Sequence, residues 1–169
     1  EVKIDSPDPE NIPGEILARG YNVMLGYYKN EEITAQTLDK DGWYHSGDLG
    51  TMDSEGNVFI KGRSKNMLLS SNGQNIYPEE IEDKLNSMAM VVESLVVQRD
   101  SKLVGLVFPD YEEAKNLNMT KDELKEIMEQ NRIQLNTEMP SYSKITEIEL
   151  YDEEFAKTAK KSIKRYLYK

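Results

Sequence analysis

The stretch GRSKNMLLSSNGQNIYPEEIE, residues 62–82, decides the fold because it runs two cations and a glycine loop directly into a helix. The cations are Arg63 and Lys65, and the loop is SSNGQN, residues 70–75. Pro78 favours the first turn of a helix, where the N–H that proline lacks would be unsatisfied in any case. The stretch therefore marks a change from a β-rich segment to alternating strands and helices.

The residues after this stretch predict helices packed on a small sheet. Ile81, Leu85 and Met88 fall on one face of the helix that begins at Pro78. Residues 94–98 and 103–108 are β-branched and apolar, and the polar turn RDSK between them predicts a hairpin.

A second, longer helix is expected where Thr120 and Glu123 have the spacing of a capping box. Its apolar face has four members: Leu124, Ile127, Met128 and Leu135. Pro140 ends it, Ile148 and Leu150 alternate with acidic residues in a predicted third strand, and residues 162–168 predict a final short helix. The expected fold class is α+β, with helices on a small sheet.

The residues before Arg63 predict a small β unit, because turn signals alternate with short apolar runs. The pairs Ile16 with Ala18 and Val58 with Ile60 have the period of two that is typical of half-buried strands. The turn DSEG is expected to join two of the strands. This unit has an abrupt beginning, so we interpret it as the end of a larger domain. The predicted boundary divides the chain into residues 1–64 and residues 65–169.

Composition excludes several function classes. The chain has 169 residues with 31 acidic and 21 basic side chains, a formal charge of -10 that argues against a general nucleic-acid-binding role. Residues 157–169 nevertheless carry six basic side chains and no acidic one, a local cationic patch that can meet a phosphate. With no cysteine and one histidine, we predict no metal-binding residues. The apolar runs are too short to span a membrane, so a cytoplasmic location is expected.

Asp48 and Arg63 are the first candidates for chemistry. Asp48 lies on the glycine-flanked turn of YHSGDLG, residues 44–50, where a carboxylate can accept hydrogen bonds from the vicinal hydroxyls of a ribose. The alternative is that it only closes an Asx turn. Arg63 has a planar cationic fork suited to phosphate or ribose oxygens, although alone it is more typical of a protein surface.

Three further positions have a functional and a plain interpretation. Lys65 at the predicted boundary permits a hinge or is a solvated loop lysine. Gly73 lets the backbone approach a ligand closely or simply forms a turn. A lysine of FAKTAKKSIKR, residues 155–165, can act as a point charge on a phosphoryl transition state, or the run is a solvated face. His45 has no evident carboxylate relay, so we interpret it as structural.

Together these motifs resemble the acyl-adenylate-forming superfamily, and most closely its AMP-forming acyl-CoA synthetases, the fatty-acid CoA ligases. GEILARGYNVMLGYY is similar to the segment in which a Gly-Glu strand leads to a Gly-Tyr turn, and DGWYHSGDLG is similar to the nucleotide-ribose motif. Residues 62–82 resemble the hinge and thiol-tunnel motif. The resemblance implies a small C-terminal lid domain, preceded by a β-rich remnant of the large N-terminal domain.

The resemblance implies a two-step reaction that uses ATP, Mg²⁺ and coenzyme A. A carboxylate attacks the α-phosphate of Mg-bound ATP and releases pyrophosphate, and the thiol of coenzyme A then displaces AMP. Asp48 would hold the ribose hydroxyls and Arg63 would assist at the ribose and phosphates. Lys65 falls on the hinge position, and Gly73 would line the pantetheine channel.

Two departures from the family pattern matter. The phosphate loop, the fatty-acid pocket and most of the adenine site are missing, so we expect a C-terminal fragment that is inactive alone. In the tail the family reads Lys-Thr, two residues, Gly-Lys-Ile, and KTAKKSIKR places Ser162 where the catalytic lysine is expected. Serine supplies no charge, so the role is expected to move to Lys161, with Lys160 and Lys164 as alternatives; otherwise the position is not catalytic here.

The leading interpretation is part of a long-chain fatty-acid CoA ligase, because the ending KRYLY resembles the fatty-acid branch. An aryl-CoA ligase or a carrier-protein-loading adenylation domain would share these motifs. A stand-alone interaction module without catalysis is the alternative from another class. The expected partners are a small carboxylate, coenzyme A and the remainder of the N-terminal domain, with peripheral membrane contact through the fatty-acid substrate and no nucleic acid.

Overall fold

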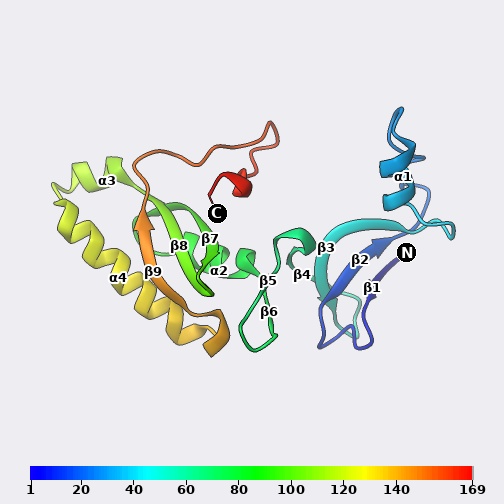
Figure 1. Ribbon diagram of the computed structural model, residues 1–169, viewed down its shortest axis with the longest axis horizontal. Coiled ribbons are helices and arrows are strands. Elements are labelled where there is room, and N and C mark those ends of the chain that lie inside the picture. Colours follow the sequence, from blue (N-terminus) through cyan, green and yellow to red (C-terminus); the bar gives the residue numbers. More distant parts are fainter. Residues whose placement is uncertain (169) are drawn as a thin grey trace. The chain divides into compact units, whose positions relative to one another are not determined.

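The computed structural model describes residues 1–168, which form two compact units, Glu1–Met67 and Leu68–Lys169 (Figure 1). Lys169, the end of the predicted cationic patch, lies outside the described residues. The first unit ends three residues after the predicted domain boundary between residues 64 and 65. That boundary stays a prediction, because a compact unit of this chain does not define a domain of a larger protein.

The first unit is built on a four-stranded antiparallel sheet, as its turn signals predict. The strands in sheet order are β1 (Val2–Asp5), β2 (Gly14–Ala18), β3 (Tyr44–Met52) and β4 (Val58–Arg63). The predicted DSEG turn joins β3 to β4, and the N–H of Gly56 donates to the carbonyl of Asp53 at 3.0 Å.

Two short helical segments of this unit were not predicted. The helix α1 (Glu31–Thr37) begins after Asn30, whose side chain accepts a hydrogen bond from the N–H of Ile33. The 3₁₀ turn η1 (Ser64–Asn66) follows β4 directly. Both are too short for a helical periodicity to be visible in the sequence.

The core of the first unit is small. Its buried apolar side chains among the described residues are Ile4 and Leu17. Ile16 and Ala18 are half-buried as predicted. The expectation of a half-buried face is wrong for Val58 and Ile60, which are 36% and 70% exposed, because no described side chain of this unit covers them.

The second unit contains the predicted hairpin and third strand. β7 (Val91–Arg99) and β8 (Lys102–Pro109) pair antiparallel, and β9 (Ile145–Leu150) adds to β8 in parallel. Asp100 and Ser101 in the hairpin turn have φ of 47° and 62°, the left-handed pair that a tight two-residue turn requires. A separate two-stranded ribbon, β5 (Leu68–Leu69) with β6 (Asn75–Ile76), precedes this sheet.

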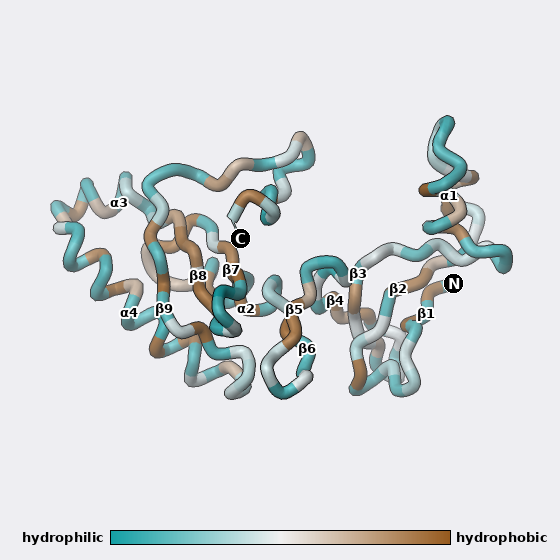
Figure 2. Tube along the Cα trace, in the orientation of Figure 1, coloured by the Kyte–Doolittle hydropathy of each residue, from teal (hydrophilic) through white to brown (hydrophobic). Residues whose placement is uncertain are grey.

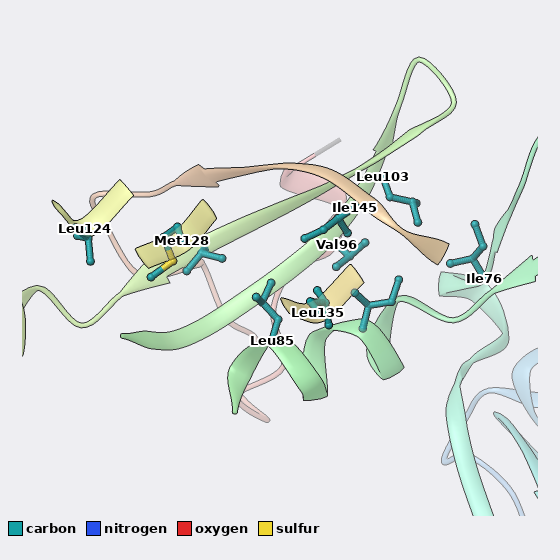
Figure 3. Close-up of a cluster of buried hydrophobic side chains, with 10 residues drawn as sticks. Ile76, Leu85, Val96, Leu103, Leu124, Met128, Leu135 and Ile145 are labelled. Atoms are coloured by element: carbon teal, nitrogen blue, oxygen red, sulfur yellow. The ribbon is translucent and has the colours of Figure 1, made fainter. Parts of the chain in front are cut away.

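Helices cover one face of the three-stranded sheet. They are α2 (Pro78–Asn86) and α4 (Lys121–Glu138). The unpredicted α3 (Tyr111–Asn116) follows β8, and a short 3₁₀ turn, η2 (Ser141–Ser143), precedes β9. The capping box of Thr120 and Glu123 is confirmed. Figure 3 shows Leu85 of α2 and Leu135 of α4 directed toward Val96 and Ile145 of the sheet, and all four are buried. In the part of the chain that the structure describes, no helix combines the length and apolarity that a bilayer span requires.

The C-terminal tail covers the opposite face of the same sheet. Phe155 is 2% exposed and packs with Leu95, Val104 and Leu106, which point away from the helices. The strands β7 and β8 therefore lie between two layers, and Figure 2 shows hydrophobic residues concentrated along them.

The predicted helix over residues 162–168 is wrong: the segment contains only a 3₁₀ turn, η3 (Arg165–Leu167). Ile163 instead forms a β-bridge with Lys157, and the side chains of Arg165 and Tyr168 are held by residues elsewhere in this unit. These tertiary contacts override the weak helical pattern of a short segment.

Candidate functional site

A bulge in β3 presents Asp48. Glu15 of β2 pairs with Leu49, and Leu17 pairs with His45, so residues 46–48 stand opposite the single residue Ile16. A bulge of this kind bends its strand and redirects its side chains. Gly47 has φ of 71° at this point, a left-handed conformation that glycine adopts without steric cost.

Arg63 reaches the bulge from the neighbouring strand. It is the register partner of Asp48 across β3 and β4, and its Nη1 donates to Asp48 Oδ1 at 2.6 Å. The same nitrogen donates to the carbonyl of Ser46 at 3.3 Å. Because the ion pair orients one carboxylate oxygen, the remaining lone pairs of Asp48 are free to accept hydrogen bonds from two hydroxyl groups.

Glu15 of β2 holds the bulge through two side-chain contacts, and it was not among the residues predicted from the sequence. Its Oε1 accepts the N–H of Gly47 at 2.9 Å, and its Oε2 lies 2.8 Å from Nδ1 of His45. On the other side of the imidazole, Oδ2 of Asp39 lies 3.8 Å from Nε2. The N–H of Trp43 lowers the pKa of Asp39, which keeps this carboxylate charged beside the ring.

The expectation that His45 has no carboxylate relay is therefore wrong. Glu15 is thirty residues away in sequence and meets His45 only because the bulge shifts the register of β2 against β3. The Gly-Glu pair that begins β2 was the available signal, but strand register cannot be read from one sequence. His45 acts here as a structural group that ties the bulge to two carboxylates.

Lys65 and Gly73 lie on either side of the division between the two units. Lys65 is an exposed residue of η1. Gly73 lies in the turn between β5 and β6 with φ of 80°, and its N–H donates to the carbonyl of Ser70 at 3.0 Å. A Cβ at Gly73 would meet nothing within 4 Å, so the turn requires glycine for its backbone angle rather than for space. Their roles at a hinge and at a thiol channel stay predictions.

The lysine-rich tail forms a tight hairpin. Lys157 pairs with Ile163, and the N–H of Thr158 donates to the carbonyl of Ser162 at 2.9 Å. Lys160, Lys161 and Ser162 are exposed at its tip, whereas Lys164 is half-buried. Lys161 has φ of 61°, a conformation that favours glycine.

Two carboxylates of the second unit hold the base of this hairpin. Glu93 of β7 accepts from Lys157 Nζ at 2.8 Å and from the N–H of Phe155 at 3.0 Å. Glu82 of α2 accepts from Arg165 Nη2, and its other oxygen accepts the N–H of Val96 at 2.6 Å. Burial raises the pKa of Glu82 to about 7, against the opposing attraction of the Arg165 guanidinium.

Residues 65–168 match the family described as AMP-binding enzyme C-terminal domain. The chain belongs to this family.

Curated relatives of this AMP-binding enzyme C-terminal domain are CoA ligases of several kinds. The chain is 48% identical over 102 residues to a substituted propanoyl:CoA ligase from Rhodococcus jostii, and 42% identical over 99 residues to a 2-succinylbenzoate–CoA ligase from Bacillus cytotoxicus. It is 38% identical over 97 residues to a long-chain-fatty-acid–CoA ligase from Gallus gallus. The matches cover 60%, 59% and 57% of this chain but only 20%, 20% and 13% of those proteins.

The fold of the whole chain recurs in solved structures. The adenylation domain of a carboxylate reductase from Mycobacterium chelonae matches 99% of this chain and 29% of its own, with a TM-score of 0.83 and 22% identity. At this identity the likeness shows the fold alone. It confirms the α+β fold class, including the β-rich segment that precedes the family match.

The structure brings together some of the predicted site residues of this AMP-binding enzyme C-terminal domain. Asp48 and Arg63 form one site in the first unit, and Lys65 follows Arg63 by two residues. Gly73 and Lys161 belong to the second unit, and within residues 1–168 no hydrogen bond joins them. Within residues 1–168 no group of three or more histidine, cysteine, aspartate or glutamate side chains could hold a metal ion.

Proposed function

We propose that this chain is the C-terminal part of an ATP-dependent long-chain fatty-acid CoA ligase, in which residues 1–64 end the large domain and residues 65–169 form the lid. The ligase converts a fatty acid, ATP and coenzyme A into acyl-CoA, AMP and pyrophosphate in the cytoplasm. The observation that carries the proposal is the Asp48–Arg63 pair on the β3 bulge, joined in sequence to an AMP-binding enzyme C-terminal domain. The chain alone is expected to be inactive.

Asp48 supplies a recognition group for a ribose. A carboxylate held at one oxygen by a guanidinium keeps acceptor positions for two vicinal hydroxyls, which is the pattern that a ribose presents. Gly47 and Glu15 hold the backbone of the bulge in place, so the carboxylate is oriented before a ligand arrives. Removing this orientation would weaken binding of ATP and of the acyl-adenylate alike.

Lys161 supplies the positive charge proposed for adenylation. It lies exposed at the hairpin tip, where a cation can stabilise the charge that develops on the α-phosphate as the carboxylate attacks. Mg²⁺ would be carried by the phosphates of ATP, because carboxylates of the described residues do not gather into a metal site. Lys65 would then act at the pivot between the two reaction steps, and Gly73 beside the pantetheine of coenzyme A.

A second candidate substrate class is an aromatic carboxylate. The relative from Bacillus cytotoxicus, named for 2-succinylbenzoate, is similar to this chain at a higher identity than the long-chain relative from Gallus gallus. The tail ending in KRYLY supports the fatty-acid class. The two classes differ in the acyl pocket, which lies outside this chain in the proposed arrangement.

The experiment is to measure pyrophosphate release by the full-length protein with carboxylic acids of graded chain length and with aromatic acids. We expect ATP-dependent release with the highest kcat/KM for long-chain acids, followed by acyl-CoA formation when coenzyme A is added. A preference for aromatic acids would replace the long-chain proposal by the aryl-CoA one. Absence of release with every acid would overturn the ligase proposal in favour of a non-catalytic interaction module.

A further inference from the structure

The lysine hairpin of the tail is held at its base and free at its tip. Ala156 and Lys164 face each other at the base, where the N–H of Lys164 donates to the carbonyl of Ala156 at 2.8 Å. Lys160 and Lys161 at the tip make no side-chain hydrogen bond or ion pair with residues 1–168. The contacts that hold the two strands of such a short hairpin determine where its tip points.

The first fixed point is on the incoming strand of the hairpin, which Glu93 of β7 holds. The side chain of Glu93 is 15% exposed, and its two oxygens bind the backbone N–H of Phe155 and the ammonium of Lys157. Phe155 is itself buried against the sheet and touches the ring of Tyr168, with ring centroids 5.0 Å apart. One carboxylate of β7 therefore fixes both the path of the chain and the first basic side chain of the hairpin.

The second fixed point is at the end of the outgoing strand, where Glu82 of α2 holds Arg165. Glu82 is 7% exposed and pairs with Arg165, whose Nη1 also reaches the carbonyl of Val96 at 3.5 Å. Glu79 Oε1 lies 3.6 Å from the same guanidinium. A buried ion pair contributes little net stability, because the loss of hydration offsets the attraction between the charges. Removing one partner is much more costly, because the other charge then stays buried without a counter-charge. The pair therefore fixes the position of Arg165 even though it adds little net stability.

We infer that Glu82 and Glu93 are positioning residues that aim the lysine-bearing tip of the hairpin at the reacting phosphate. This inference rests on the proposed function. The two carboxylates come from different elements, α2 and β7, and grip the two strands of the hairpin independently. Neither touches the tip, so Glu93 acts on adenylation through Phe155 and Lys157, and Glu82 acts through Arg165.

The first test measures the hairpin itself in the 169-residue chain. Glu82→Gln keeps the shape and the acceptor for the N–H of Val96 but removes the charge that faces Arg165. We expect faster hydrogen–deuterium exchange over residues 156–165 in this variant and in Glu93→Gln, with the core strands unchanged. Asp83→Asn, an exposed neighbour on the same helix, is the matched control and should exchange like the wild type.

The second test separates the two half-reactions in the full-length enzyme. Glu82→Gln and Glu93→Gln should each slow acyl-adenylate formation by about 10- to 100-fold. Thioester formation from preformed acyl-adenylate should stay at the wild-type rate. Glu82→Gln introduced into an Arg165→Gln background should cost little more, because the partner is already gone.

Exchange and adenylation like those of Asp83→Asn in both glutamine variants would overturn the inference. Equal losses in both half-reactions would also overturn it, because they indicate general loss of the domain rather than misdirection of the tip. If the wild-type enzyme forms no acyl-adenylate, the proposed function fails. The exchange measurement then still decides whether the two carboxylates anchor the hairpin.

Discussion

At the residue scale, the ion pair between Asp48 and Arg63 orients the Asp48 carboxylate and contributes little to stability. Their side chains are 33% and 45% exposed, and ion pairs at such exposure contribute about 0–1 kcal/mol to folding. A change at Asp48 should therefore affect ligand binding far more than the free energy of unfolding.

Asp48→Asn in the full-length protein is expected to raise the KM for ATP and to lower kcat/KM for adenylation by at least about tenfold, because the amide presents one acceptor oxygen where the carboxylate presents two. Steady-state kinetics measures the KM and kcat/KM, and chemical denaturation measures the free energy of unfolding. The control is Glu55→Gln, which alters an exposed carboxylate in the turn that joins β3 to β4. It should leave the kinetics and the free energy of unfolding unchanged. A normal KM for ATP in Asp48→Asn would contradict the assignment.

Lys161 combines a functional expectation with a strained backbone, and two substitutions separate them. Lys161→Ala and Lys161→Gly both remove the ammonium and are expected to slow acyl-adenylate formation while sparing thioester formation. Only Lys161→Gly relieves the left-handed conformation, so it should raise the free energy of unfolding by about 1 kcal/mol relative to Lys161→Ala. Kinetics and denaturation measure the two effects in the same variants.

Unchanged adenylation in both variants would refute the role of Lys161 and leave Lys160 and Lys164 as candidates. Lys160→Ala serves as the matched control, since Lys160 is an exposed neighbour at the same tip. Loss of adenylation in Lys160→Ala alone would move the assignment by one residue.

Glu82 gives the protein a measurable pH dependence. Burial raises its pKa from the ordinary 4.5 to about 7, and the groups that face it are Arg165 from the tail and Glu79 from its own helix. Because the pKa is higher in the folded state, the contribution of Glu82 to stability is fully present below about pH 4.5. It is lost as the pH rises through about 7.

Relative to Glu82→Gln, the wild-type free energy of unfolding should therefore fall by roughly 1–3 kcal/mol as the pH rises from about 4.5 to about 7. Chemical denaturation across this window measures the difference. The Asp83→Asn curve should run parallel to the wild-type curve. A wild-type curve that rises instead would mean that the Arg165 ion pair outweighs the burial of Glu82.

At the element scale, the side chain of Asn136 joins α4 to the first residue of β9 through two hydrogen bonds. Asn136 Nδ2 donates to the carbonyl of Ile145 at 2.8 Å, and its Oδ1 accepts the N–H of the same residue at 2.9 Å. Asn136→Ala should lower the free energy of unfolding by roughly 1–3 kcal/mol, because the N–H of Ile145 loses its side-chain acceptor and its carbonyl keeps only the longer bond from Arg132 Nη1 at 3.4 Å. Gln134→Ala on the exposed side of α4 is the control for helix propensity.

Elements with strong local signals could be predicted from the sequence. The α2 and α4 helices and the β7–β8 hairpin begin and end close to their proline, capping and turn residues. Elements of two turns or fewer, α1 and α3, escaped because their periodicity is too short to distinguish from loops. The predicted helix at residues 162–168 failed because tertiary contacts decide the path of that segment.

The candidate site divides in the same way. Asp48 and Arg63 could be named because their motif surrounds them in sequence. Glu15, Glu82 and Glu93 could not, because each binds a side chain thirty or more positions away, through strand register or tail packing. Local sequence carries no record of such pairings.

At the scale of the whole molecule, the two units differ in how much apolar surface they bury. Among the described residues the first unit buries Ile4 and Leu17, whereas the second contains two apolar clusters on the two faces of its sheet. The first unit also exposes Phe59 and Ile60, at 53% and 70%. Most of the hydrophobic stabilisation therefore resides in the second unit.

Residues 65–169 produced alone should unfold in one cooperative transition with a Tm close to the main transition of the whole chain. Residues 1–64 produced alone should show no cooperative transition, because so small a core does not offset the loss of chain entropy. Circular dichroism melts of the three polypeptides measure this. A sharp melt of residues 1–64 would show that its exposed apolar strands are stable without a covering partner.

The bulge at residues 46–48 also limits which mutations this segment can accept during evolution. The strand pairs in fixed register on both sides of the bulge, with Leu17 opposite His45 and Glu15 opposite Leu49. Deleting one bulge residue would turn every later side chain of β3 to the opposite face of the sheet. Substitutions around Asp48 are therefore compatible with the fold. Insertions and deletions within residues 46–48 should be removed by selection, even if loops nearby tolerate changes in length.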